Sequence, residues 1–250
     1  MIIDGRVHVG RSIFGYELDP AAVAARMQQV GIDRAVLFPV KPMTYEFRTA
    51  NDFVADAVRR NPDRFAGVGR VDPWQGELAL REVERCVQDL GLKGIYINPV
   101  EENFQANHEV VHPVAELAAK LNIPLFIEAG YARVSHPSQV GDLASQFPKT
   151  TIVATNGGQL NISGMLLGEA RTMLEENPNV YIETSGTYRE DFLEEVMSEV
   201  GDTRVIFASG APRYDQEFEM ERVKMAHLSD DHKQRMWSEN LLRILGTAVR

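Results

Sequence analysis

The stretch "LNIPLFIEAG", residues 121–130, shows the unit from which this fold is built. Asn122 is a residue that commonly ends a helix, because it tolerates the left-handed backbone of a C-cap. The apolar run after it is as short as a buried strand and ends in a carboxylate, Glu128. A strand that is apolar at nearly every position is typical of a parallel sheet covered by helices. The stretch therefore predicts the end of a helix, a tight turn and a buried strand.

The same unit recurs along the chain. Short apolar runs, each expected to form a strand, lie at 2–9, 34–40, 65–71, 93–99, 123–129, 151–155, 180–185 and 204–209. Amphipathic runs, each expected to form a helix, lie near 20–30, 47–60, 76–89, 109–120, 137–146, 162–176, 188–200 and 215–227, with a last one near 230–245. Eight strand–helix units in 250 residues predict an α/β fold. We expect a (β/α)8 TIM barrel, with distortion of the ring allowed, in one domain over 1–250. The last helix is additional to the barrel.

An open, doubly wound sheet is the alternative arrangement of such units. That fold commonly carries a glycine-rich phosphate loop after its first strand. The glycines of "GVGR" at 67–70 do not have the GxGxxG spacing of such a loop. The barrel is therefore the prediction.

The composition of the chain indicates which binding partners are disfavoured and in which cellular compartment we expect the protein. The chain has 26 Lys and Arg against 36 Asp and Glu, a formal net charge of −10, which argues against nucleic acid or an anionic membrane as a partner. A single cysteine, Cys86, cannot form an internal disulfide, which fits a reducing compartment. There is no signal-peptide pattern, and no apolar run reaches the roughly 18 residues of a membrane helix. We expect a cytoplasmic protein.

Polar side chains gather where the expected strands end. The interior positions of most strands are apolar, so this asymmetry predicts a functional site, because buried polar groups cost free energy unless they are paired. In a barrel of this kind the site lies at the carboxyl ends of the strands. The residues concerned are Arg6, His8, Arg70, Tyr96, Asn98, Glu128, Asn156, Thr184, Ser209 and Arg213, with Lys41, Glu183 and Ser185 beside them.

Eight blocks of the sequence resemble successive blocks of one family. They are "IIDGRVHVG" (2–10), "PDRFAGVGRVDP" (62–73), "GLKGIYINP" (91–99), "IPLFIEAG" (123–130), "TIVATNGGQLN" (151–161), "NVYIETSG" (179–186), "VIFASGAPRYD" (205–215) and "MWSENLLRILG" (236–246). Together they resemble the amidohydrolase superfamily, in the branch of aminocarboxymuconate-semialdehyde decarboxylase, benzoate-type decarboxylases and a metal-independent pyrone-dicarboxylate lactonase. The resemblance implies the barrel and a small carboxylate or lactone substrate. The implied reactions are hydrolysis, decarboxylation or related acid–base chemistry.

The chain departs from that family at the metal site. The family pattern opens D-x-H-x-H, whereas this chain has Asp4, Arg6 and His8. Asn98, Glu128, Asn156 and Gly210 stand where the family has three histidines and an aspartate. Of the five metal-site positions only His8 is retained. We therefore expect no cofactor; if zinc does bind, His8 and Glu128 are its expected ligands, since zinc prefers nitrogen, carboxylate or thiolate donors.

The substitutions suggest a coupled change of chemistry. Arg6 supplies positive charge that a metal would supply, and Glu128 can pair with it and fix its orientation. In this hypothesis Arg6 binds a substrate carboxylate or stabilises an oxyanion, and His8 or Glu128 is the general acid or base. The expected substrate-binding residues are Asn98, Asn156, Arg70, Tyr96, Thr184, Ser209 and Arg213. The expected partner is a small anionic molecule, and a homodimer is compatible with exposed apolar helix faces.

Three other interpretations remain open. The first is a pseudoenzyme that binds a ligand without turnover, and the second is a metal-dependent hydrolase with a non-standard site. The third is a structural barrel whose centre is filled and whose Arg6 forms a buried ion pair. A cavity of a few hundred cubic ångströms at the barrel mouth favours an enzyme or binding protein over the third interpretation.

Overall fold

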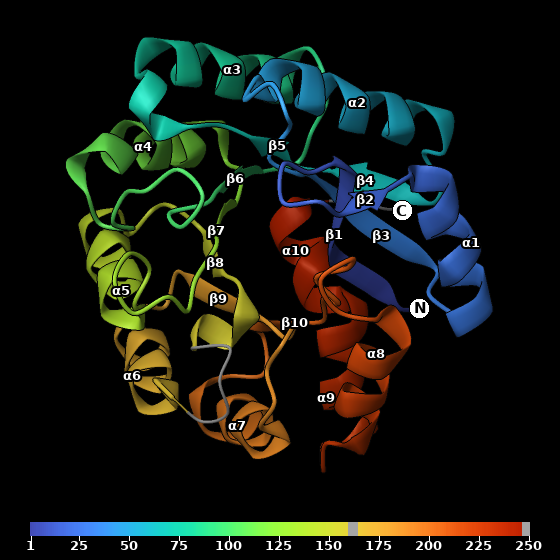
Figure 1. Cartoon of the computed structure of the whole chain (residues 1–250). Helices are drawn as coiled ribbons and strands as arrows, with labels where there is room; N and C mark the ends of the chain where they lie inside the picture. Colours follow the sequence, from blue (N-terminus) through green and yellow to red (C-terminus); the bar gives the residue numbers. More distant parts are fainter. Residues whose placement is uncertain (160–164, 247–250) are drawn as a thin grey trace.

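The computed structural model describes residues 1–159 and 165–246. In this part of the chain, short strands alternate with helices, and the helices surround the strands (Figure 1). The strands are β1 (Ile3–Arg11), β2 (Glu17–Leu18), β3 (Arg34–Pro39), β4 (Phe65–Gly67), β5 (Gly69–Arg70), β6 (Ile95–Ile97), β7 (Leu125–Ile127), β8 (Ile152–Ala154), β9 (Val180–Glu183) and β10 (Val205–Ile206). The helices are α1 (Pro20–Val30), α2 (Phe47–Arg60), α3 (Glu77–Gln88), α4 (His112–Leu121), α5 (Pro137–Gln146), α6 (Leu167–Glu176), α7 (Glu190–Glu195), α8 (Gln216–Met225), α9 (Asp230–Gln234) and α10 (Asn240–Leu245).

The strands form two sheets, and backbone hydrogen bonds join the edges of one sheet to the edges of the other. One sheet has the order β2-β1-β3-β4 and the other β10-β9-β8-β7-β6-β5, and the pairs are parallel except β1 with β2. The expected strand 65–71 is split at Val68, where the chain changes neighbours, and the Val68 N–H donates to the Leu37 carbonyl at 2.9 Å. At the other edge, the Gly5 N–H donates to the Phe207 carbonyl at 2.9 Å. The predicted (β/α)8 arrangement is confirmed.

Local sequence signals set the ends of the helices. The Asp19 carboxylate accepts from the Ala21 N–H at 2.7 Å and begins α1, and Gly31 ends it at φ 82°. Asn122 ends α4 at φ 54°, the left-handed C-cap that the sequence predicts. The first residues of the helix expected at 162–176 lie partly outside the described residues, and α6 is observed from Leu167.

The additional C-terminal helix closes the end of the barrel at which the strands begin. Residues 230–245 form a helical segment made of α9, a short wider turn (Arg235–Glu239) and α10. Leu241 and Leu245 pack with the apolar side chains inside the ring, which are Ile3, Val36, Phe38, Ala66, Val68, Tyr96, Phe126, Val153 and Ile206. Asn240 Nδ2 donates to the Val205 carbonyl at 2.8 Å and fixes α10 to β10. The core therefore fills the amino-terminal part of the barrel, and the polar residues are left at its carboxyl end.

Among the described residues, none of the helices is both long enough and apolar enough to span a bilayer.

Candidate active site

Arg6 lies at the centre of the strand ends and is almost fully buried. Its Nη1 is 2.6 Å from the Glu128 carboxylate at the end of β7. Its Nη2 is 3.0 Å from the Glu183 carboxylate, the last residue of β9. Nη2 also donates to Asn156 Oδ1 at 3.0 Å and to Ser185 Oγ at 2.6 Å. One guanidinium on β1 therefore connects residues at the carboxyl ends of β7, β8 and β9.

Glu128 is held as a carboxylate. Burial by itself raises its pKa, but the charges of Arg6 and Arg213 outweigh burial and lower the pKa to about 2. Its oxygens also accept from the Tyr96 hydroxyl at 3.0 Å and the Thr155 hydroxyl at 3.2 Å. With this many donors, Glu128 fixes the positions of its neighbours and is poorly suited to exchange protons near neutral pH.

Glu183 is the second carboxylate on Arg6. It accepts from the backbone N–H groups of Asn156 and Ser185, both at 2.7 Å, and from the Ser185 hydroxyl at 2.8 Å. Burial raises its pKa more than Arg6 lowers it. The sequence places Glu183 at a strand end beside the site, but its contact with Arg6 cannot be predicted from the sequence, because the two residues are distant in the chain.

His8 follows Arg6 on β1 and keeps part of its surface exposed in a pocket. Its Nε2 is 3.5 Å from Arg6 Nη1, and its ring lies 5.7 Å from the Phe38 ring and 5.5 Å from the Tyr96 ring. Burial, and then the charge of Arg6, lower the His8 pKa well below 6.5, so the imidazole is neutral at pH 7. Since a guanidinium can only donate, Nε2 is the acceptor and the proton is on Nδ1. Within the described residues Nδ1 has no hydrogen-bond partner.

Asn156 is presented by a left-handed turn (Asn156–Gly158) after β8. The backbone φ angles are 55° at Asn156, 64° at Gly157 and 69° at Gly158. The Asn156 Nδ2 donates to the Ala129 carbonyl at 3.2 Å and to the Thr155 hydroxyl at 3.0 Å, which leaves Oδ1 for Arg6. The two glycines allow this turn, because a left-handed backbone strains residues with a side chain.

Three of the expected substrate-binding residues hold protein groups in place. Asn98 Oδ1 accepts from the N–H of Glu101 at 3.0 Å, and its Nδ2 donates to the Tyr96 hydroxyl at 2.9 Å. The Thr184 hydroxyl bonds to the backbone of Ala208. The Ser209 hydroxyl donates to the Asp4 carboxylate at 2.6 Å. None of these three lines the pocket beside His8.

The other expected cations already have carboxylate partners. Arg213 Nη1 is 3.0 Å from Glu128 and 3.3 Å from the Tyr131 hydroxyl, with about a third of its side chain exposed. Arg70 is buried between Glu101 at 2.5 Å and Glu102 at 2.8 Å. The structure therefore places the predicted cations near one another, with their charges largely balanced.

The pocket at the barrel mouth is small. Its volume is about 10 Å³, which is space for about one water molecule. The lining residues are Arg6, His8, Tyr16, Tyr96, Glu101, Gly210, Pro212 and Arg213. Tyr16, Glu101 and Pro212 were not predicted, because they come from loops, in which no periodic pattern marks the side chains that face inward. Among the described residues, the pocket beside His8 is therefore far smaller than the few hundred cubic ångströms expected of an open site.

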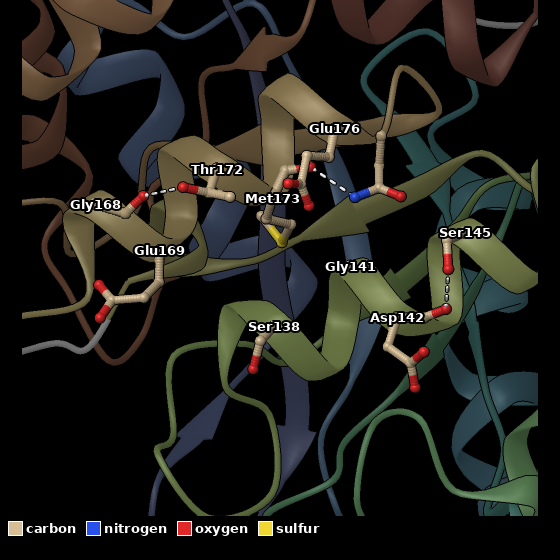
Figure 2. Close-up of a pocket in the computed structure, with 10 residues that line it drawn as sticks. Ser138, Gly141, Asp142, Ser145, Gly168, Glu169, Thr172, Met173 and Glu176 are labelled. Carbon is tan, nitrogen blue, oxygen red and sulfur yellow. Dashed lines mark hydrogen bonds between the residues drawn. The ribbon is translucent and has the colours of Figure 1, made fainter.

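A groove of about 720 Å³ lies between α5 and α6 (Figure 2). It is lined by Ser138, Gly141, Asp142, Ser145, Gly168, Glu169, Thr172, Met173, Glu176 and Asn177. None of the residues around Arg6 lines it. The groove is therefore a surface feature and is separate from the candidate site.

Comparisons with known proteins agree with the fold. A family model described as Amidohydrolase matches residues 3–247. A gamma-resorcylate decarboxylase of Polaromonas sp. (strain JS666 / ATCC BAA-500) is 24% identical over 212 residues, which are 66% of this chain and 65% of that protein. The chain thus spans just under two thirds of the length of this curated relative.

Solved structures show the same architecture. A TIM-barrel protein from Bordetella bronchiseptica superposes with a TM-score of 0.79 at 19% identity, covering 100% of this chain and 99% of that chain. A dihydroxybenzoic acid decarboxylase from Polaromonas sp. JS666, solved with bound manganese, gives a TM-score of 0.75 at 17% identity, covering 98% and 96% of the two chains.

The expectation that no cofactor is needed is contradicted by the second of these structures, which holds manganese. In residues 1–159 and 165–246 of this chain, no three His, Cys, Asp or Glu side chains are grouped so that they could hold a metal ion. The fallback pair, His8 and Glu128, supplies only two donors, and the Arg6 guanidinium lies against both Glu128 and Glu183. Side chains arranged in this way do not fit a divalent ion, and we derive no chemical step through one.

Proposed function

The chain belongs to the amidohydrolase family, and on that premise we propose that it is an enzyme that decarboxylates a small carboxylate by acid–base chemistry. The relative from Polaromonas, a decarboxylase by name, supports this choice of reaction over hydrolysis. We propose the cytoplasm as the compartment, since Cys86 is a buried free thiol. The proposed partners are a small anion and a second copy of the chain.

The observation that carries the proposal is the position of His8 among cations. Burial lowers the His8 pKa most, and the charges of Arg6, Arg70 and Arg213 lower it further against the opposing charge of Glu128. A substrate carboxylate in the pocket would neutralise part of this positive field and favour the imidazolium form. Binding of the anion would therefore let His8 take up a proton that it cannot hold in the free protein.

Arg213 is the proposed contact for the substrate carboxylate. It lines the pocket and is the most exposed of the guanidinium groups around His8, so an incoming carboxylate can replace Glu128 on it. Arg6 keeps both of its buried carboxylates, Glu128 and Glu183, and holds the strand ends in place. In this scheme Arg6 and Glu128 are positioning residues and His8 is the catalytic residue.

The proposed step balances without a further reactant. The imidazolium of His8 gives its proton to the substrate carbon that bears the carboxylate, using an electron pair of the substrate's π system. The bond between that carbon and the carboxylate then breaks, its electron pair returns to the π system, and carbon dioxide leaves. Neutral His8 takes up the next proton when the next anion binds.

A second candidate is a ligand-binding protein without turnover. The observation in its favour is that the central charges are paired and the pocket holds about one water molecule. In this case the same anion would bind at Arg213, and His8 would serve only as a hydrogen-bonding group.

The test measures carbon dioxide release and ligand binding in parallel. The protein is incubated with aromatic mono- and dicarboxylates, gamma-resorcylate among them, with and without added Mn²⁺, and binding is followed by calorimetry. For any substrate found, we expect His8→Asn to retain binding and to lose about 100-fold or more in turnover, since the amide cannot transfer the proton. His227→Asn is the matched control, because that imidazole is 93% exposed and is not among the residues that line the pocket.

The outcomes separate the two candidates. Binding without release of carbon dioxide contradicts the enzyme and supports the ligand-binding protein, and the absence of both contradicts each candidate. Activity that requires Mn²⁺ and survives His8→Asn contradicts the proton-transfer role of His8.

A further inference from the structure

The loop after β6 forms part of the pocket wall. Residues 99–104, which we call the cover, contribute Glu101 to the pocket wall. The cover is a compact turn, because the Glu102 N–H donates to the Asn98 carbonyl and the Phe104 N–H to the Pro99 carbonyl, both at 3.1 Å. Phe104 is buried in the core and anchors the end of the turn.

Three side chains from other elements hold the cover down. The ammonium of Lys41, beyond β3, donates to the Glu101 carbonyl and lies 3.3 Å from the Glu102 carboxylate. Arg70, at the end of β5, pairs with both carboxylates. The indole of Trp74 donates to the Glu102 carbonyl at 3.1 Å. The cover is therefore closed by contacts that an opening motion must break.

In the closed arrangement, two buried polar atoms of the ion pairs lack hydrogen-bond partners among the described residues. These atoms are Arg70 Nε and Glu102 Oε2. Buried polar groups without partners are costly, so an arrangement that gives them partners is favoured. Burial also raises the pKa of Glu102. The two cations and two carboxylates thus form a balanced cluster that another anion can rearrange.

The cover is coupled to the central site by a chain of hydrogen bonds. Asn98 accepts from the Glu101 N–H and donates to the Tyr96 hydroxyl, which donates to Glu128. Glu128 in turn holds Arg213, and the Arg70 guanidinium lies 5.2 Å from the centre of the Tyr96 ring. Arg70 and Arg213 are therefore both linked to Tyr96, Arg70 through its position over the ring and Arg213 through Glu128.

We propose that a ligand with two acidic groups opens the cover, with one group on Arg213 and the other taking the place of Glu101 on Arg70. This proposal rests on the proposed function for the contact at Arg213 and adds a second anion site at Arg70. A pocket with room for about one water molecule must widen to admit an organic acid, and the cover, which contributes Glu101 to the wall, is held by contacts that an anion can replace. A monocarboxylate has no second group to displace Glu101, so it leaves the cover closed.

Trp74 provides a direct readout of opening. The chain has two tryptophans, Trp74 and Trp237, so Trp237→Phe leaves the indole on the cover as the only one. In this variant, isophthalate is expected to produce a saturable change in tryptophan fluorescence, and benzoate at the same concentrations is expected to produce none. Equal responses to the two acids, or no response to isophthalate, overturn the proposal.

Variants of the Arg70–Glu101 ion pair test whether the second acidic group of the ligand replaces Glu101 on Arg70. In the Trp237→Phe background, Glu101→Gln removes the competing carboxylate, and we expect isophthalate to bind about tenfold more tightly. Arg70→Gln is expected to abolish the response. Arg48→Gln is the control, because Arg48 forms a 3.5 Å pair with Glu82 on the outer surface. If Glu101→Gln binds isophthalate no more tightly than the parent, the exchange does not occur.

These measurements do not depend on turnover. Opening by isophthalate with no carbon dioxide release from any substrate leaves this inference intact and contradicts the proposed reaction. If carbon dioxide is released from a substrate but isophthalate does not change the fluorescence of Trp74, this inference is contradicted and the proposed reaction is not.

Discussion

Arg6 stabilises the carboxyl end of the barrel because a single planar guanidinium serves four acceptors on three other strand ends. The pairing also provides a positive charge beside two glutamates, Glu128 and Glu183, that are both buried at the polar end of the barrel. Buried ion pairs of this kind add little net stability when complete, but removal of one partner leaves a buried charge uncompensated. The cost of losing Arg6 should therefore exceed what its contacts alone suggest.

Arg6→Met tests this at the residue scale. We expect the free energy of unfolding to fall by about 3–5 kcal/mol, because Glu183 loses its counter-ion and Glu128 keeps only the partly exposed Arg213. Chemical denaturation measures the change, with Arg26→Met as the control. Arg26 pairs with Asp215 and Glu217 on the exposed surface, so its loss should leave the unfolding curve unchanged. A variant of Arg6 that is as stable as the parent would show that the ion pairs are dispensable.

Glu128 makes the stability depend on pH in a predictable direction. Its pKa is lowered from 4.5 to about 2, so its contribution is fully present above pH 4.5 and is lost as the pH falls toward 2. We expect the difference in unfolding free energy between the parent protein and Glu128→Gln to shrink steadily over that interval. Urea denaturation at a series of pH values measures it, and a difference that stays constant contradicts the lowered pKa.

At the scale of elements, the turn after β8 sets the position of Asn156 in the site. Asn156 reaches Arg6 only because three successive residues take left-handed conformations. A Cβ on Gly157 would lie 2.6 Å from the Thr187 hydroxyl, so a side chain there meets both strain and a clash. The turn thus fixes a side chain of the site through the conformation of residues that do not touch it.

Gly157→Ala is expected to destabilise the protein by about 1–3 kcal/mol, the usual cost of such a strained position. Gly168→Ala is the matched control. Gly168 lies in α6, and a Cβ there meets nothing within 4 Å, so alanine should be neutral or slightly stabilising. Thermal and urea denaturation of both variants give the comparison, and equal stabilities would contradict the strain argument.

The strands and helices could be predicted because their signals are periodic and local. Apolar runs mark β7 and β8, and the left-handed cap at Asn122 marks the end of α4. The centre of the site could be predicted in part, since Arg6, His8 and Glu128 stand at strand ends. The roles of Glu101 and Tyr16 could not be predicted, because loop geometry decides where those side chains point. The low pKa of Glu128 also depends on contacts with Arg6 and Arg213, which are distant in the sequence.

At the scale of the whole molecule, α10 completes a core that the ring of strands cannot fill alone. Leu241 is almost fully buried and belongs to the cluster inside the barrel. Leu241→Ala should lower the free energy of unfolding by about 2–5 kcal/mol through lost burial and the cavity left behind. Leu78→Ala is the control, because Leu78 on α3 is 62% exposed. Denaturation curves that coincide for the two variants would show that α10 is not part of the core.

The seam between the first and last strands has a consequence for how the protein is made. Asp4 accepts hydrogen bonds from Ser209, 205 positions away, and the Gly5 N–H donates to the Phe207 carbonyl. A ribosome synthesises β1 first, so this strand has no partner on that side until most of the chain has emerged. Contacts between such distant segments form slowly, and unpaired edges are prone to aggregate. During synthesis the nascent amino-terminal half is therefore the part of this protein with the greatest need of a chaperone.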